Sequence, residues 1–135
     1  MKKYIFIIFL LFFSSFLESK VFFGEKIKIE SIKEDVFALG EKIEVNGNLE
    51  NEFIGIGRNI FSDISVNGDY IGIGLNQKLK CESKSDVYIL GSNIETTGNI
   101  KGSIAVFGNT VSLNCNIEKN LRIFGEKIFL NTNVA

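Results

Sequence analysis

Four acidic side chains that recur with a 17-residue spacing are the best candidates for chemistry in this sequence. The residues five positions before each of six regularly spaced glycines are Asp35, Glu52, Asp69, Asp86, Ser103 and Asn120. Carboxylates in a row could bind calcium or a sugar. The other interpretation is structural, because Asp, Asn and Ser often cap turns by accepting hydrogen bonds from the backbone. We expect turn capping, and we predict no metal site.

The two thiols share another column of the same spacing. Cys81 and Cys115 are separated by twice the 17-residue spacing. If each 17-residue unit is one coil of a stack, the two cysteines are separated by two coils, or about 9.6 Å. A disulfide needs Cα atoms within about 7 Å. We therefore predict two separate, inward-facing core thiols, and two cysteines without histidine do not complete a zinc site.

The composition argues against most enzymes. The chain has no histidine, proline or tryptophan, and its formal charge is -1. Histidine is the commonest general base near neutral pH, and its absence removes many catalytic mechanisms. A nearly neutral chain also has no electrostatic basis for binding nucleic acid. The sequence predicts a protein that is not an enzyme, with no cofactor, no small-molecule substrate and no nucleic-acid partner.

A 17-residue repeat organises the chain. Six glycines mark it without an insertion: Gly40, Gly57, Gly74, Gly91, Gly108 and Gly125. The flanking columns are apolar, and segments such as Ile43-Glu44-Val45-Asn46 alternate with the period of a strand. A shorter copy, Phe23 to Ile29, precedes them at an offset of 16. We predict an all-β, single-stranded parallel β-helix of about six to seven coils, with glycine at a corner that needs positive φ or close backbone approach.

The N-terminus has the features of an export signal. Lys2 and Lys3 precede the uncharged run from Tyr4 to Leu17, and polar residues follow. This run is shorter than the stretch of about 20 residues that a spanning helix needs. We predict a helical signal peptide over residues 1–19, cleaved after Ser19, with an uncleaved anchor as the alternative. Residues 20–135 would form the β-helix domain, exported to the periplasm or cell envelope.

The first strand of each coil is apolar on both faces. If Val36 and Ala38 point inward, an outer stripe is made of Phe37, Leu39, Ile54, Ile56, Ile71, Ile73, Tyr88 and Leu90. Such a stripe indicates a protein partner or a membrane surface. Alternatively, a backbone kink before the glycine turns the Leu39 column inward. The stripe is expected to fade at Ala105 and Arg122, which favours the N-terminal half as the contact.

Two further features concern the regularity of one coil and the end of the stack. Gln77 and Ser83 occupy core columns of the coil that follows Gly74, which predicts a soft spot or an irregular coil there. At Ala135 the last coil has just closed, without a polar cap. Exposed strand edges associate, so we expect either that the rod continues in another molecule or that the chain is a shortened member of a longer family.

Asparagines recur in two more columns. They are Asn46, Asn114 and Asn131, and Asn48, Asn99, Asn116 and Asn133. Stacked amides form ladders in coiled and fibrous β structures. We expect these columns to brace turns.

The segment from Asp35 to Gly47 (DVFALGEKIEVNG), echoed from Asp86 to Gly98, resembles the bactofilin family of polymer-forming cytoskeletal proteins. The resemblance covers most of residues 20–135. It implies a right-handed triangular β-helix that polymerises end to end without nucleotide, near the membrane, with roles in cell shape. The export signal departs from usual members and favours an envelope scaffold.

Three classes of function are compatible with a β-helix, and the sequence excludes one of them. A structural protein that self-associates through its β-helix ends is the first, with membrane or envelope contact through the stripe. A carbohydrate-binding or carbohydrate-active β-helix protein of the envelope is the second. The third, a hexapeptide-repeat acyltransferase, fails because 17 is not a multiple of six and no histidine can act as base. We expect a homo-oligomer or polymer.

Overall fold

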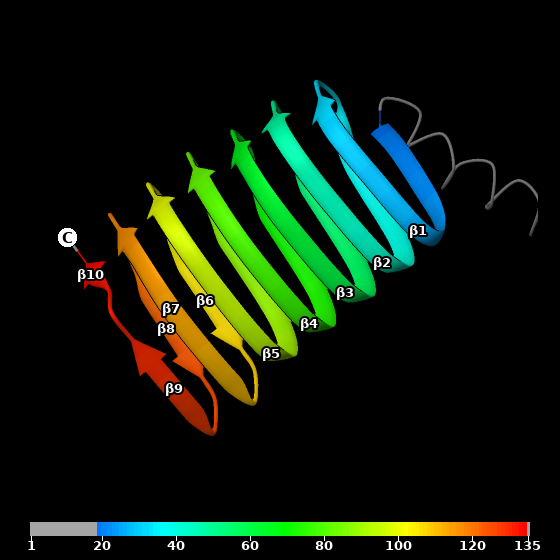
Figure 1. Ribbon diagram of the computed structural model, residues 1–135. Coiled ribbons are helices and arrows are strands. Elements are labelled where there is room, and N and C mark those ends of the chain that lie inside the picture. The colour runs from blue at the N-terminus through cyan, green and yellow to red at the C-terminus, as the bar shows by residue number, and fades with distance from the viewer. Residues whose placement is uncertain (1–18, 135) are drawn as a thin grey trace, which may run out of the picture.

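The chain forms one ladder of parallel coils. The computed structural model describes residues 19–134, and its ten strands join in a single sheet (Figure 1). The strands are β1 (Ser19–Ile32), β2 (Asp35–Leu49), β3 (Phe53–Val66), β4 (Tyr70–Ser83), β5 (Val87–Ile100), β6 (Ile104–Phe107), β7 (Thr110–Ile117), β8 (Leu121–Phe124), β9 (Lys127–Leu130) and β10 (Asn133–Val134). The described residues contain strands and no helix.

Each coil stacks in register on the next. Leu39 of β2 pairs with Ile56 of β3, and every later parallel pair keeps the same 17-residue offset. The first pair, β1 with β2, has an offset of 16 that shifts between Glu30 and Ile32. The predicted parallel β-helix is therefore confirmed, with about seven coils. The predicted signal helix lies outside the described residues, except for Ser19, which begins β1.

Alternation along each strand produces the core. In β2, Val36, Ala38, Ile43 and Val45 are buried, while the residues between them face outward. The same columns repeat through the stack, so side chains of like size lie above one another. Burying a Val, Leu or Ile side chain stabilises a fold by about 1.5–3 kcal/mol. This interior ladder is the main source of stability in a solenoid whose coils contact only their neighbours.

In two coils, a large aromatic side chain in one inward column is accompanied by glycine in the next inward column. Phe53 and Tyr70 are buried and stack with ring centroids 5.0 Å apart. The residues two positions on, Gly55 and Gly72, have no side chain, and a Cβ at Gly55 would lie 2.8 Å from the Phe53 ring. Large rings beside glycine thus replace the medium-sized pairs of other coils. The Tyr70 hydroxyl shares a 2.9 Å hydrogen bond with the Ser62 hydroxyl, which satisfies both polar groups inside the core.

The glycine corner is explained by close backbone approach. A Cβ built on Gly91 would overlap the carbonyl oxygen of Gly74 in the coil below, and Gly40, Gly57 and Gly74 make the same approach to the glycine before them. None of these corner glycines has positive φ. Among the described glycines, positive φ occurs instead at Gly47 and Gly98, where φ is 96° and 121°. Of the two reasons predicted for the corner, the structure supports the second.

The coil that carries Gln77 and Ser83 is regular, so the prediction of an irregular coil is wrong. β4 pairs with β3 and β5 without a register shift. Gln77 is buried, and its amide nitrogen donates hydrogen bonds to the carbonyl oxygens of Gly72, Gly74 and Leu90 at 3.3, 3.1 and 2.8 Å. The buried Ser83 hydroxyl donates to the Ser85 carbonyl at 2.9 Å. Local polar partners therefore satisfy the Gln77 amide nitrogen and the Ser83 hydroxyl, whereas the Gln77 Oε1 atom is buried without a hydrogen-bond partner in residues 19–134.

Candidate functional site

The acidic column caps the turns between coils. The Asp35 carboxylate accepts a hydrogen bond from the Glu52 backbone N–H at 3.1 Å, and Asp69 accepts one from Asp86 N–H at 3.1 Å. Asp86 and Ser103 continue the ladder with bonds of 2.8 and 3.2 Å from the next backbone N–H. Each of these side chains therefore binds the same position one coil later. Within residues 19–134 no group of three or more His, Cys, Asp or Glu side chains is placed to hold a metal ion.

Removing one cap should weaken the solenoid. Asp86→Ala leaves the Ser103 N–H without its charged acceptor, and we expect the free energy of unfolding to fall by about 1.5–3 kcal/mol. Glu52→Ala is the matched control, because the exposed Glu52 carboxylate makes no such bond to residues 19–134 and its loss should cost less than about 0.5 kcal/mol. Urea denaturation of the two variants measures the difference. Equal effects would contradict the capping role.

The two thiols lie in the core, as predicted. Cys81 and Cys115 are buried, and neither forms a disulfide. Gly98 occupies the coil between them in the same column. The Cys115 thiol contacts the Thr96 carbonyl oxygen at 3.4 Å. Burial raises the pKa of Cys81 to about 12 and that of Cys115 to about 11, so both thiols are protonated and unreactive near neutral pH.

These thiols predict alkaline destabilisation. In the unfolded chain they ionise near their ordinary pKa of 9.0, whereas in the folded chain they hold their protons to about pH 11 and 12. Their contribution to stability is full below pH 9 and declines above it, by at most about 1.4 kcal/mol per pH unit for each thiol. Denaturation at about pH 8 and about pH 10.5 should show this loss. Cys81→Ala/Cys115→Ala should reduce the slope, and an unchanged slope would contradict the assignment.

Amide ladders run along the outer surface. Asn116 donates to Asn99 at 2.8 Å and Asn133 donates to Asn116 at 3.2 Å, in one of the two predicted columns. A second ladder, which the sequence interpretation missed, joins Asn76 to Asn59 at 2.9 Å and Asn93 to Asn76 at 3.0 Å. The sequence could have predicted this second ladder, because its three asparagines share the same 17-residue spacing. Both ladders tie neighbouring coils together.

The apolar stripe lies on the outer face of the first strand segment of each coil. Val36 and Ala38 point inward, so no kink turns the Leu39 column into the core. Of the eight predicted stripe residues, Leu39, Ile73, Tyr88 and Leu90 are exposed and Phe37, Ile54, Ile56 and Ile71 are half-buried. A shallow groove follows the Leu39 column along the glycine corner.

The stripe extends further than expected. Its Phe37 column does end at Ala105 and Arg122, but the Leu39 column continues to Phe107 and Phe124, whose exposed rings stack 5.3 Å apart. At the other end of the column, Phe23 is 68% exposed and its ring lies 6.5 Å from that of Phe37. The expectation that the stripe fades is therefore correct for the Phe37 column and wrong for the Leu39 column, and where contacts occur stays a prediction. From here on, the apolar stripe means the eight predicted residues with Phe23, Phe107 and Phe124.

One border of the apolar stripe is acidic. The capping carboxylates Asp35, Asp69 and Asp86 lie two residues before the Phe37 column, at the start of β2 and directly before β4 and β5. The Tyr88 hydroxyl contacts the Asp86 carboxylate at 3.4 Å, and the negative charge of Asp86 raises the pKa of Tyr88. A partner for the stripe must tolerate this row of negative charge.

The last coil exposes residues that belong to core columns. Ile128 and Leu130 of β9 are 42% and 54% exposed. Ile43 and Val45, which occupy the same two columns in β2, are fully buried. At the opposite end of the stack, Ile27 and Ile29 of β1 are buried as well. Within residues 19–134, the inward columns are therefore exposed at β9 and buried at β1.

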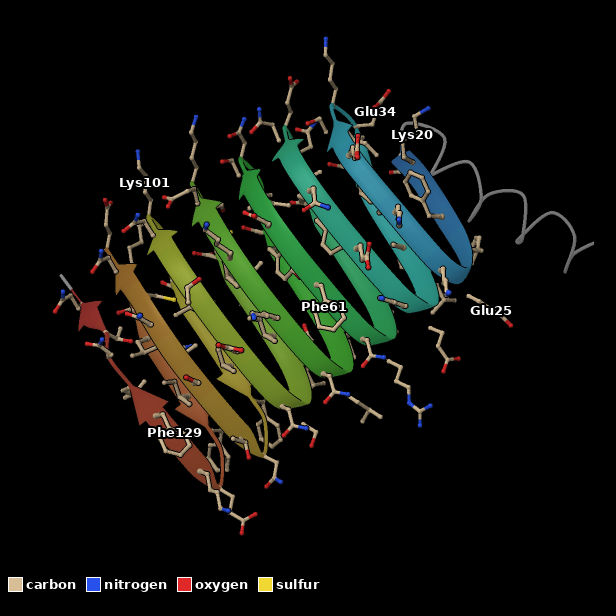
Figure 2. The ribbon with its side chains drawn as sticks, in the orientation of Figure 1. Lys20, Glu25, Glu34, Phe61, Lys101 and Phe129 are labelled. Carbon is tan, nitrogen blue, oxygen red and sulfur yellow. The ribbon has the colours of Figure 1, made fainter. Side chains whose placement is uncertain are left out.

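A mixed hollow lies on the other face of the solenoid. Its lining includes Phe61, Glu44, Lys78 and Glu95 from successive coils. The Phe61 side chain stands out from this face in Figure 2, and the Lys42 ammonium lies 5.9 Å from the centre of its ring. An exposed ring beside carboxylates and ammonium groups provides both the stacking surface and the hydrogen-bonding groups that a sugar-binding site needs.

These features define the chain as a parallel β-solenoid protein with an apolar stripe, an uncovered last coil and capped turns. Comparison with protein families, with curated proteins and with solved structures finds no match to this chain. Nothing in residues 19–134 is a helix with the length and apolar character needed to cross a membrane.

Proposed function

We propose that this chain is an exported, non-enzymatic structural protein of the cell envelope that self-associates through its β-helix ends. The observation that carries the proposal is the exposure of Ile128 and Leu130, whose columns are buried in every complete coil. The resemblance to bactofilins points the same way, because that family polymerises end to end. The signal-like residues 1–19 support export, and they favour an envelope scaffold over a cytoplasmic filament.

The physical reason for association is the cost of an uncovered coil. Apolar side chains at the last coil, Ile128, Leu130 and Val134, are about half exposed, so covering them contributes on the order of 1 kcal/mol each. The same coil presents strand edges, on which another chain can continue the hydrogen-bond ladder. The last coils of two copies meeting end to end would cover both surfaces at once. The apolar stripe then serves as a second surface, for contact with the membrane or another envelope component.

Electron microscopy of residues 20–135 tests this proposal. One solenoid of about seven coils is about 34 Å long. End-to-end contact predicts rods of at least twice that length, whose number rises with protein concentration. Particles that keep the length of one solenoid at every concentration would argue against it.

The hollow around Phe61 supports a second candidate function, carbohydrate binding. Titration of envelope-type oligosaccharides, followed by protein NMR or calorimetry, would show saturable binding that Phe61→Ala removes if this candidate holds. Asn93→Ala, on another column of the surface, is the matched control. Absence of binding in the millimolar range would leave the scaffold as the better account.

A further inference from the structure

The apolar stripe consists of two parallel columns that run along the axis of the solenoid. The columns are two residues apart on each strand, so their outer side chains are separated by about 7 Å. In one of them the small Ala105 follows Tyr88. A hollow opens at this place between the two columns, and its lining includes Ile73, Leu90 and Phe107. The stripe therefore offers a seat for an apolar side chain of a partner.

The spacing of the coils fits a helix better than an extended strand. Neighbouring coils are about 4.8 Å apart. A helix that lies along the stripe presents an apolar side chain about every 5.4 Å, one per turn, whereas one face of a strand presents a side chain about every 6.7 Å. The helix therefore stays within half a coil of the stripe over about four coils, and the strand over about one. Amphipathic helices commonly bind in apolar grooves in this way.

One border of the stripe carries negative charge that no ion pair within residues 19–134 neutralises. Its carboxylates, one in each of four consecutive coils, are those of Asp35, Glu52, Asp69 and Asp86. The hydrogen bonds that Asp35 and Asp69 accept within these residues all end on Oδ1, so the second oxygen of each is open to a donor from a partner. At the opposite border, the glycine corner, Glu41 pairs with Arg58 at 3.4 Å.

The acidic border selects among the possible occupants of the stripe. An anionic membrane surface repels such a row, and membrane-binding surfaces usually carry lysine and arginine beside their apolar residues. A second copy of this chain would bring the same four carboxylates, with a single basic group in its stripe columns, Arg122. A partner with its own row of cations is complementary to this border, and neither of these two is.

We propose that the apolar stripe is the docking groove for an amphipathic helix of a partner protein, whose apolar face is flanked on one side by lysine or arginine. The inference rests on the proposed role of the stripe as a contact surface, and it names the partner. Apolar side chains of the helix lie between the two columns, with one of them in the hollow beside Ala105. The flanking cations bind the four carboxylates of the border. They are needed over four coils only, because Ser103 and Asn120 continue that column without charge.

Peptide binding tests the inference, with protein purified after expression of the full-length chain. The probe is a synthetic helix of about 19 residues, which spans the stripe, with a leucine face and one lysine per turn along one side. A second peptide has glutamate in place of lysine, and a third has the composition of the first in scrambled order. The lysine peptide should bind roughly tenfold or more tightly than the other two, and salt should weaken it. The gain in helical circular dichroism on binding reports on the peptide, because residues 19–134 contain no helix.

Two pairs of variants locate the contact. Glu52→Lys reverses one charge of the border without removing a backbone cap, so it should weaken the lysine peptide and strengthen the glutamate peptide, each by at least threefold. Glu95→Lys makes the same change of charge on the other face and should alter neither. Leu90→Gln should weaken the lysine peptide at least fivefold, whereas Phe61→Gln, at a similarly exposed apolar residue of the other face, should not. Melting curves close to that of the parent show that the variants are folded.

The outcomes separate this inference from the proposed end contact. Preferential binding of the lysine peptide that survives Ile128→Glu/Leu130→Glu supports the docking groove, even if no rods form. The inference is overturned, even if rods form, by equal binding of the lysine and glutamate peptides or by no binding in the millimolar range. Binding without a gain in helix, or binding that Glu52→Lys or Leu90→Gln leaves unchanged, overturns it as well.

The remaining occupants of the stripe are outcomes of the same test. If the lysine peptide does not bind and Leu90→Gln abolishes flotation with phosphatidylethanolamine and phosphatidylglycerol vesicles, the stripe contacts lipid and the inference is wrong. If the peptide does not bind and Leu90→Gln abolishes a dimer seen in sedimentation, the occupant is a second copy and the inference is equally wrong.

Discussion

Gly91→Ala is expected to unfold the solenoid or to lower its free energy of unfolding by about 3 kcal/mol or more. A Cβ at Gly91 would overlap the carbonyl oxygen of Gly74 and would lie 3.0 Å from the Gln77 amide nitrogen. The carbonyl is part of the backbone ladder, so it cannot rotate away as a flexible side chain would. Relief requires the two coils to separate at the corner, which breaks the register that holds the core columns together.

Gly24→Ala is the matched control, because Gly24 occupies the same corner column in the first coil. The nearest atom to its Cβ would be the Lys26 carbonyl oxygen at 3.9 Å, which is ordinary contact. We expect a change within about 1 kcal/mol. Thermal and urea denaturation of both variants measure the contrast. If Gly91→Ala and Gly24→Ala have the same stability, close approach is not the reason for the glycine column.

Ile128→Glu/Leu130→Glu is expected to abolish end-to-end association. Both side chains belong to inward columns, and stacking another coil on them would bury two carboxylates among apolar groups. Burying a polar group without a partner costs several kcal/mol, and a charge costs more, so the association constant should fall by at least a hundredfold. Sedimentation velocity of the parent and the variant at matched concentrations measures the loss.

Phe129→Glu controls for charge and position. Phe129 lies between the two inward residues but faces outward, as its side chain shows in Figure 2. It would remain outside an end-to-end stack, so its replacement should change the association constant less than tenfold. If Phe129→Glu disrupts assembly as strongly as Ile128→Glu/Leu130→Glu, the contact is not made by the stacked core columns.

The fold was predictable because a solenoid repeats its signals. The six glycines and their apolar neighbours determined the 17-residue coil, the parallel register and the inward positions of Cys81 and Cys115. The offset of 16 between Phe23 and Leu39 also appears as the register of β1 on β2. Periodicity alone was sufficient here, since each coil packs on a copy of itself.

Local compensation was not predictable from the columns. Gln77 suggested an irregular coil, yet its amide finds three carbonyl oxygens in a regular strand. The choice between positive φ and close approach at the corner also needed coordinates, because either reason selects glycine. The stripe was expected to fade because Ala105 and Arg122 interrupt one column, whereas Phe107 and Phe124 continue the other. These three features depend on how the side chains of neighbouring columns pack, and the residue types in a single column do not show that packing.

Sedimentation velocity of residues 20–135 across a wide concentration range measures self-association of the solenoid. We expect a monomer at low concentration and a growing fraction of dimers and larger elongated species as concentration rises. The elongated species should disappear with Ile128→Glu/Leu130→Glu and persist with Phe129→Glu. A single monomeric species at all concentrations would contradict self-association, and with it the structural role proposed for this solenoid.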